Sequence, residues 1–314
     1  MKRVLIAILL ATTCQIMNAD ASTANEDEDV SVDKDVNADY KLYILKITAY
    51  LDEDKCVDTD GNLLSGKTKM RSHRYSDEDW KSEKLCINGE AVEERGYYKN
   101  GKRQYIIPLK NGKFEGIARF FYENGKLKAE VPYKNGKNEG VAKHFFEDGR
   151  LEEETPYKNA VKEGIDRTYH YDGKLKHEAT YKNGKCEGVV KHFYLGGKLW
   201  SETPCKNGER EGIMRTFSES GKLEQEYPYK NGVKDGIAKS YYPSGELKSE
   251  TPYKNDVAEG EMKAFSKNGE IWGIITYKKA KAINGVCYKT NGEERTLTEA
   301  ELENWGISVY EICK

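Results

Sequence analysis

The residues from Gly61 to Thr68 (Gly-Asn-Leu-Leu-Ser-Gly-Lys-Thr) match the pattern of a phosphate-binding P-loop, in which backbone N–H groups and a lysine cradle a nucleotide. That chemistry requires a strand before the loop and a helix after it. The residues that follow, Lys69 to Tyr75, carry no apolar helical stripe. The Ser-Gly-Lys part also fits the start of a degenerate repeat. We therefore expect no nucleotide binding and no cofactor.

Histidines are the next candidates for chemistry, because imidazole is a common metal ligand and general base. The sequence has five: His73, His144, His170, His177 and His192. His144 and His192 hold the same position in two repeats that a third repeat separates, so a sheet would place them about 19 Å apart. Metal ligands must converge to bond distance, which favours solvated cross-strand histidines. The sequence also lacks Gly-x-Ser-x-Gly and His-Glu-x-x-His motifs, and we expect no metal site, no catalytic residues and no enzymatic activity.

Charged side chains recur in two files with a 24-residue period. The basic file is Arg119, Lys143, Arg167, Lys191, Arg215, Lys239 and Lys263, and the acidic file is Glu130, Glu154, Glu178, Glu202, Glu226 and Glu250. Files of both signs at one period favour cross-strand ion pairs, each worth roughly a few tenths of a kcal/mol. Phospholipid headgroups are the alternative ligand. With 51 basic and 53 acidic side chains, no global field attracts nucleic acid.

The same 24-residue period governs most of the chain and determines its fold. Each repeat has an acid followed by glycine, a second glycine, a large aliphatic residue two positions later, and a Tyr-Lys-Asn segment. The first glycines are Gly116, Gly140, Gly164, Gly188, Gly212, Gly236 and Gly260; the second are Gly125, Gly149, Gly173, Gly197, Gly221, Gly245 and Gly269. Helices are excluded because glycine and proline recur too densely.

Each repeat predicts a β-hairpin. Between Gly116 and Glu139, a strand rich in β-formers ends at an Asn-Gly turn, and a second strand leads to another Asn-Gly turn. Because proline cannot donate to a ladder, we expect the second strand to stop near position 131, before Pro132. A three-residue loop would set Phe121 opposite Leu127, whereas a two-residue turn would set Arg119 opposite Glu130. We prefer the first register, because it gathers the aromatic, leucine and Tyr133-type residues on one face.

One aromatic file is a candidate for either ligand contact or sheet stability. It consists of Phe121, Phe145, Tyr169, Phe193, Phe217, Tyr241 and Phe265.

The repeat pattern Glu-Gly-x4-aromatic-x3-Gly-Lys-Leu-x2-Glu-x-Pro-Tyr-Lys-Asn-Gly-Lys resembles the bacterial variant of the MORN repeat, whose members often carry the label of a YwqK-type antitoxin component. The resemblance covers roughly residues 61–293 and is strong over 97–278. It implies an all-β fold: an elongated, twisted antiparallel sheet of consecutive 24-residue hairpins. The family label also suggests an antitoxin-like role, whereas the residues themselves indicate no reaction.

Cysteines suggest how this sheet is reinforced. Six cysteines follow the first 21 residues: Cys56, Cys86, Cys186, Cys205, Cys287 and Cys313. Six cysteines allow 15 different sets of pairings. Cys186 lies at the start of one hairpin and Cys205 at its end, where other repeats have tyrosine. We expect these two to pair, although strict alternation puts them on opposite faces, so a bulge is required. By proximity in sequence we pair Cys56 with Cys86 and Cys287 with Cys313. Unpaired thiols are the alternative.

The two ends differ from the repeats. A basic pair, an apolar run too short to span a bilayer and a small-x-small cleavage pattern predict a signal peptide: Lys2–Arg3, Val4–Ala11 and Ala19–Ala21, with cleavage before Ser22. A lipoprotein acylated at Cys14 is the alternative, although the residues before Cys14 lack the lipobox pattern. Tyr40 to Leu51 is expected to form an edge strand. Near the C-terminus, Thr298 and Glu301 form a capping-box pattern that opens a short helix to Trp305.

These segments give five parts: a signal peptide (1–21), a disordered acidic tether (22–39), an N-terminal cap with a degenerate repeat (40–95), the hairpin repeats (96–283) and a C-terminal cap (284–314). We expect an exported protein, periplasmic, secreted or on the cell surface. It would act as a non-enzymatic scaffold that binds an unknown protein or a cell-surface component through the sheet. An antitoxin or immunity role is the first alternative, and binding to phospholipid headgroups at a membrane surface is the second.

Overall fold

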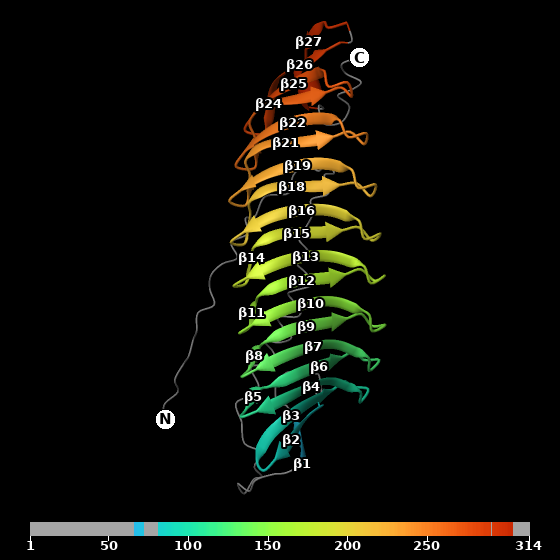
Figure 1. Cartoon of the computed structure of the whole chain (residues 1–314), viewed down its shortest axis with the longest axis vertical. Coiled ribbons are helices and arrows are strands. Elements are labelled where there is room, and N and C mark those ends of the chain that lie inside the picture. Colours follow the sequence, from blue (N-terminus) through green and yellow to red (C-terminus); the bar gives the residue numbers. More distant parts are fainter. Residues whose placement is uncertain (1–65, 72–80, 290, 304–314) are drawn as a thin grey trace, which may run out of the picture. The chain divides into compact units, whose positions relative to one another are not determined.

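The computed structural model describes residues 66–71, 81–289 and 291–303. Nearly all of these residues lie in strands or in the turns that join them. Each strand pairs with its neighbour in the chain, always antiparallel, so that the strands lie side by side in sequence order (Figure 1). The result is one long open sheet of consecutive hairpins with a single short helix near the C-terminus, which confirms the expected fold class.

Seven units repeat the same two strands. A six-residue strand comes first: β6 (Gly116–Phe121), β9 (Gly140–Phe145), β12 (Gly164–Tyr169), β15 (Gly188–Phe193), β18 (Gly212–Phe217), β21 (Gly236–Tyr241) and β24 (Gly260–Phe265). An eight-residue strand follows: β7 (Leu127–Lys134), β10 (Leu151–Lys158), β13 (Leu175–Lys182), β16 (Leu199–Lys206), β19 (Leu223–Lys230), β22 (Leu247–Lys254) and β25 (Ile271–Lys278).

Short and terminal strands complete the sheet. Two-residue strands lie next to the long ones: β5 (Lys113–Phe114), β8 (Lys137–Asn138), β11 (Val161–Lys162), β14 (Lys185–Cys186), β17 (Glu209–Arg210), β20 (Val233–Lys234) and β23 (Val257–Ala258). The ends are formed by β1 (Gly66–Arg71), β2 (Lys81–Ile87), β3 (Glu90–Tyr97) and β4 (Arg103–Lys110), and by β26 (Lys281–Tyr288), β27 (Glu294–Thr296) and α2 (Glu299–Glu303).

Two kinds of connection alternate along the sheet. At one end of the strands, tight turns such as Asn135-Gly136 join Lys134 to its partner Lys137, and both turn residues have positive φ, 50° and 77°. This is the conformation that Asn-Gly accepts most readily in hairpins. At the other end, a five-residue loop such as 122–126 is closed by hydrogen bonds from Tyr122 N–H to Lys126 C=O and from Gly125 N–H to Tyr122 C=O.

A β-bulge after the five-residue loop decides which residues share a face. Phe121 lies opposite Leu127, as expected, but the register then shifts at Lys128, so that Arg119 lies opposite Glu130. The expected register is therefore right beside the loop and wrong beyond it, where the alternative applies. A bulge adds one residue to one strand only. Tyr133 consequently lies on the face opposite to Phe121 and Leu127, and the expected single face of aromatic, leucine and tyrosine residues is wrong.

The two faces of the sheet differ in burial. We call one the core face; in the first full unit it carries Ala118, Phe120, Ala129, Val131 and Tyr133, all at most 7% exposed. We call the other the ladder face; it carries the residues that alternate with these, which are half-buried or exposed: Ile117, Arg119, Phe121, Leu127, Glu130 and Pro132.

Proline does not end the second strand. β7 continues through Pro132 to Lys134, contrary to the expectation of a stop near 131. In a strand the N and C=O of one residue point to the same neighbour. On that side Pro132 C=O accepts the N–H of Glu139, at the bulge between β8 and β9. The ladder is interrupted there, and a bulge is a position at which a strand tolerates a residue without an N–H.

The acid before each first glycine closes a turn of the next unit. Glu115 Oε2 accepts the N–H of Asn135 at 2.7 Å, although the two residues are 20 positions apart. Four further glutamates repeat this bond to asparagine: Glu139–Asn159, Glu163–Asn183, Glu187–Asn207 and Glu211–Asn231. Glu259 makes it to Lys279 N–H. These acids before the first glycines therefore hold adjacent units together.

The C-terminal cap contains the predicted capping box. Glu301 Oε2 accepts the Thr298 N–H at 2.9 Å, and Thr298 Oγ1 lies 3.4 Å from Glu301 N at the start of α2. Leu302 packs against a small core of Ala264, Ile275, Cys287 and Leu297. Trp305, expected to end the helix, and the expected edge strand 40–51 lie outside the described residues. Within those residues, the structure has no helix that is long and apolar enough to cross a membrane.

The expected boundaries of the repeat region fall inside strands. Position 95/96 lies within β3 and position 283/284 within β26. The hydrogen-bonded sheet therefore continues from the repeats into both flanking parts.

Candidate interaction surface

A row of exposed aliphatic side chains runs along the ladder face. It consists of Ile117, Val141, Ile165, Val189, Ile213 and Ile237, which are 38–53% exposed. Each aliphatic residue of the row lies opposite one residue of the following strand. Five of these six partners are prolines, which extend the apolar surface, and the sixth is Thr180: Pro132, Pro156, Thr180, Pro204, Pro228 and Pro252. We call each aliphatic residue with its cross-strand partner a rung. Successive rungs are two strands apart, which corresponds to about 10 Å. Single exposed aliphatics are ordinary on protein surfaces, whereas their recurrence at one position makes this face a candidate interaction surface.

Ion pairs line one side of this row. Arg167 bridges two strands, with Nη1 3.3 Å from Glu154 and Nε 2.9 Å from Glu178. Arg215 bridges Glu202 and Glu226 in the same way, at 3.2 and 3.0 Å. Single pairs occur at Arg119–Glu130 and Lys239–Glu250. The basic and acidic files thus meet each other, which supports cross-strand pairing over an anion-binding track.

The aromatic file lies on the ladder face beyond the ion pairs. Each member lies opposite a large aliphatic residue next to the five-residue loop, as Phe121 does with Leu127. All seven members of the file are half-buried: Phe121, Phe145, Tyr169, Phe193, Phe217, Tyr241 and Phe265. The Tyr169 hydroxyl donates to Glu154 at 3.0 Å and the Tyr241 hydroxyl to Glu226 at 2.8 Å. Burial and the hydrogen bond to Glu226 raise the pKa of Tyr241 to about 12. The file therefore connects the ion pairs to the loop side of the sheet.

The core face is polar in the middle of the array. Thr155 Oγ1 lies 2.5 Å from the buried Asp166 carboxylate, and Lys162 Nζ lies 3.2 Å from it. Burial raises the pKa of Glu153, which lies beside Thr155. Here the buried charges pair with each other and with a hydroxyl.

Two histidines meet on the same face. His177 lies directly opposite His192, with 3.4 Å between their Nδ1 atoms. Burial lowers the pKa of His192 to about 4, helped by the nearby His177, and burial lowers that of His177 as well. Burial also lowers the pKa of His144 to about 4. Among the described residues no group of three or more His, Cys, Asp or Glu converges as a metal site. Sequence reasoning missed the His177–His192 pair because the bulge sets their register.

The structure joins Cys186 and Cys205 in a disulfide with a Cα–Cα distance of 5.8 Å. Strict alternation of side chains would put Cys186 and Cys205 on opposite faces of the sheet. The alternation is broken at Glu187, between the end of β14 and the start of β15, where Gly188 lies opposite Cys205. Cys86 and Cys287 are also disulfide-bonded. Their expected partners, Cys56 and Cys313, lie outside the described residues.

Other predicted positions are placed only in part. Gly66, Lys67 and Thr68 belong to strand β1, where a P-loop would begin a helix. The signal cleavage residues Ala19, Ala21 and Ser22 lie outside the described residues.

Two solved structures to which this chain is similar are both distant likenesses. The crystal structure of TcdB2-TccC3 matches 74% of this chain at 12% identity with a TM-score of 0.17, and the chain spans 16% of its length. Virginiamycin B lyase from Staphylococcus aureus matches 74% of this chain and 84% of its own at 10% identity, with a TM-score of 0.15. At these TM-scores neither likeness bears on fold or function. No curated protein matches the chain.

A family model gives a direct assignment. The MORN repeat variant matches eight successive segments: 92–111, 114–135, 138–159, 162–183, 187–207, 210–231, 234–255 and 258–279. Together these cover more than half of the 314 residues. Their spacing agrees with the hairpin units of the sheet, and the chain belongs to the family of MORN repeat variant proteins.

Proposed function

We propose that this protein is an exported, non-enzymatic scaffold that binds a protein partner along the ladder face. The observation that carries the proposal is the row from Ile117 to Ile237, because six exposed aliphatic side chains recur at one position on the same face. A repeat scaffold offers an extended surface of this kind. Because the charges beside the row are paired with each other, the partner would bind mainly through apolar contacts, with hydrogen bonds at the edge of the row.

The partner surface follows from this geometry. Rungs about 10 Å apart suit a polypeptide that presents apolar side chains at a matching spacing. Removal of two rungs in the middle of the row, by Ile165→Ser and Ile213→Ser, would therefore weaken binding more than removal of even more exposed side chains elsewhere. Leu195, 62% exposed in a five-residue loop, and Tyr171, 59% exposed, provide that comparison.

The test uses the full chain with a photo-crosslinking residue at position 165 or, as a control, at position 195. Extracts and envelopes of the source cells are the probe. We expect position 165 to capture one protein, and the Ile213→Ser background to reduce its capture at least tenfold, while Leu195→Ser has no effect. Equal capture from positions 165 and 195, or no effect of Ile213→Ser, would contradict the proposal.

The same samples separate the other roles. Binding to phosphatidylglycerol vesicles with the same dependence on Ile213 would identify phospholipid as the ligand. A captured polypeptide whose toxicity is suppressed by this chain would identify an antitoxin or immunity role. Export is tested by N-terminal sequencing of the mature protein, which should begin at Ser22. A start at Cys14 would indicate a lipoprotein, and an intact Met1 on a cytoplasmic protein would refute export.

A further inference from the structure

One loop position carries a ring in most units and a serine in two. The eight residues at this position are Tyr98, Tyr122, Phe146, His170, Tyr194, Ser218, Tyr242 and Ser266. Each of the four tyrosines donates its hydroxyl to the backbone C=O of the residue 23 positions later, at 2.6–2.8 Å: Tyr98 to Phe121, Tyr122 to Phe145, Tyr194 to Phe217 and Tyr242 to Phe265. The His170 ring lies 2.9 Å from Phe193 C=O. The ring therefore bridges two consecutive five-residue loops.

Ser218 is too short to make this bridge. Its hydroxyl instead lies 2.8 Å from Ser220 Oγ and 3.4 Å from Lys222 C=O, within its own loop. The equivalent acceptor, Tyr241 C=O, lies 23 positions later and receives no donor from residue 218. The missing ring coincides with a hollow of about 340 Å³ between this loop and the next.

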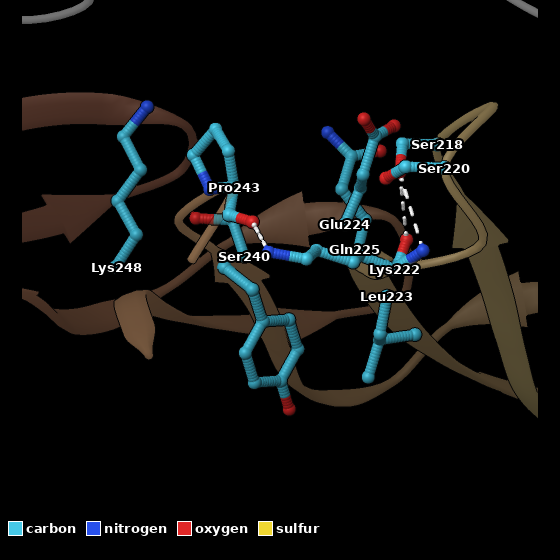
Figure 2. A pocket seen from close by; sticks show the side chains of 10 residues that line it. Ser218, Ser220, Lys222, Leu223, Glu224, Gln225, Ser240, Pro243 and Lys248 are labelled. Carbon is cyan, nitrogen blue, oxygen red and sulfur yellow. Dashed lines mark hydrogen bonds between the residues drawn. The ribbon is translucent and has the colours of Figure 1, made fainter. Parts of the chain in front are cut away.

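Figure 2 shows the surroundings of the hollow. Ser218 lies on one side and Pro243 and Lys248 on the other, and Lys222 crosses between the loops to donate to Pro243 C=O at 2.6 Å. Glu224 holds the position at which Lys128 stands 5.6 Å from the centre of the Tyr122 ring in the first full unit. The volume lies at the lower end of the roughly 300–1,000 Å³ that is typical of small-molecule sites.

We propose that this hollow binds a para-hydroxyphenyl group. The ring takes the volume that tyrosine fills in neighbouring units, and its hydroxyl donates to Tyr241 C=O. The chain itself shows this geometry four times, with the same acceptor position in each case. A ring without a hydroxyl leaves that carbonyl without its donor, so phenol is preferred over benzene. The site lies beside the loops and uses none of the aliphatic row, so it is independent of the proposed scaffold function.

The first test measures binding to the full chain by isothermal titration calorimetry and ligand-observed NMR. The probes are p-cresol, toluene and N-acetyltyrosinamide. We expect p-cresol to bind at millimolar concentration and toluene at least tenfold more weakly. The variant Ser218→Tyr fills the hollow from within and should abolish p-cresol binding, whereas the matched variant Ser266→Tyr should retain it. Absence of p-cresol binding, equal binding of toluene, or retention of binding by Ser218→Tyr would overturn the proposal.

A second variant makes the test independent of whether Ser218→Tyr folds. Tyr122→Ser removes a ring that the structure shows in place, and should create a second equivalent site. We expect two molecules of p-cresol to bind this variant, and its melting temperature to rise with p-cresol more than that of the native chain. A stoichiometry unchanged from the native chain would refute the assignment. Tighter binding of N-acetyltyrosinamide than of p-cresol would identify a tyrosine side chain of a polypeptide as the source, and the reverse order a free phenol.

Discussion

Cys186 and Cys205 form their disulfide across the two positions at which neighbouring units stack a side chain on a tyrosine ring. One unit earlier these positions hold Lys162 and Tyr181, with the ammonium 5.0 Å from the ring centre. One unit later they hold Arg210 and Tyr229, at 5.1 Å. Two further units repeat the contact, Phe114–Tyr133 as an edge-to-face pair and Lys234–Tyr253 as a cation–π pair. At these positions four units make a non-covalent contact with a tyrosine ring, and a fifth replaces it by the covalent Cys186–Cys205 bond.

The double variant Cys186→Ser/Cys205→Ser should lower the free energy of unfolding by about 3 kcal/mol, because the bond closes a 19-residue loop. The variant Cys186→Lys/Cys205→Tyr restores the contact of neighbouring units and should recover about 0.5–1 kcal/mol of this loss. Urea unfolding under oxidising and reducing conditions measures both. Equal midpoints for the two variants would show that the lysine–tyrosine contact adds nothing here.

Ala160 occupies the second position of a tight turn at which most units have glycine, and its φ is +65°. Ala160→Gly should raise the free energy of unfolding by about 0.5–1 kcal/mol, because glycine accepts this conformation without steric cost. The reverse change, Gly136→Ala, should lower it, since φ is +77° and an added Cβ meets only Lys113 Cβ, at 3.8 Å. Thermal unfolding of both variants measures these changes; a lower stability of Ala160→Gly or a higher stability of Gly136→Ala than the native chain would show that turn conformation does not control stability.

Tyr122→Phe should cost about 1 kcal/mol, because its hydroxyl donates to Phe145 C=O at 2.6 Å. Phe146 holds the same position one unit later without a hydroxyl, so Phe146→Tyr offers the matched gain. We expect its unfolding midpoint to rise as that of Tyr122→Phe falls. If neither midpoint moves, the hydroxyl bridge between loops contributes no net stability.

Stability should fall as the pH drops from about 6.5 to about 4. Burial lowers the pKa of His144 and His192 to about 4, so the unfolded chain binds protons in this range that the folded chain does not. The loss should be about 1–3 kcal/mol for His192. The raised pKa of Glu153 has the opposite sign and partly offsets it at the acid end.

The variant His192→Gln tests this dependence. It removes one titrating ring and relieves the proximity to His177, Lys176 and Arg210, which also disfavour its protonation. We expect urea midpoints to change less between pH 6.5 and 4.5 than in the native chain. An identical pH slope in both proteins would contradict a titrating role for His192.

Much of this architecture follows from local sequence. The 24-residue period, the Asn-Gly turns, the strands between them and the capping box at Thr298 depend on turn chemistry and side-chain propensity, which act over a few residues. For the same reason the opposition of Phe121 and Leu127 was predictable, because the loop between them fixes it. The pairing of Cys186 with Cys205 also followed from hairpin geometry, apart from the break that permits it.

The tertiary structure decided which residues share a face and which units they join. The bulge at Lys128 shifts the cross-strand partner of every residue beyond it. Tyr133 therefore lies on the core face, and Arg119 lies opposite Glu130. The sequence carries no mark that distinguishes a bulge from a turn of different length. Contacts over 19, 20 and 23 residues, such as Lys162–Tyr181, Glu115–Asn135 and Tyr122–Phe145, arise only when strands from different units lie side by side. Local sequence determines each hairpin, whereas the register between hairpins depends on hydrogen bonds that form only in the assembled sheet.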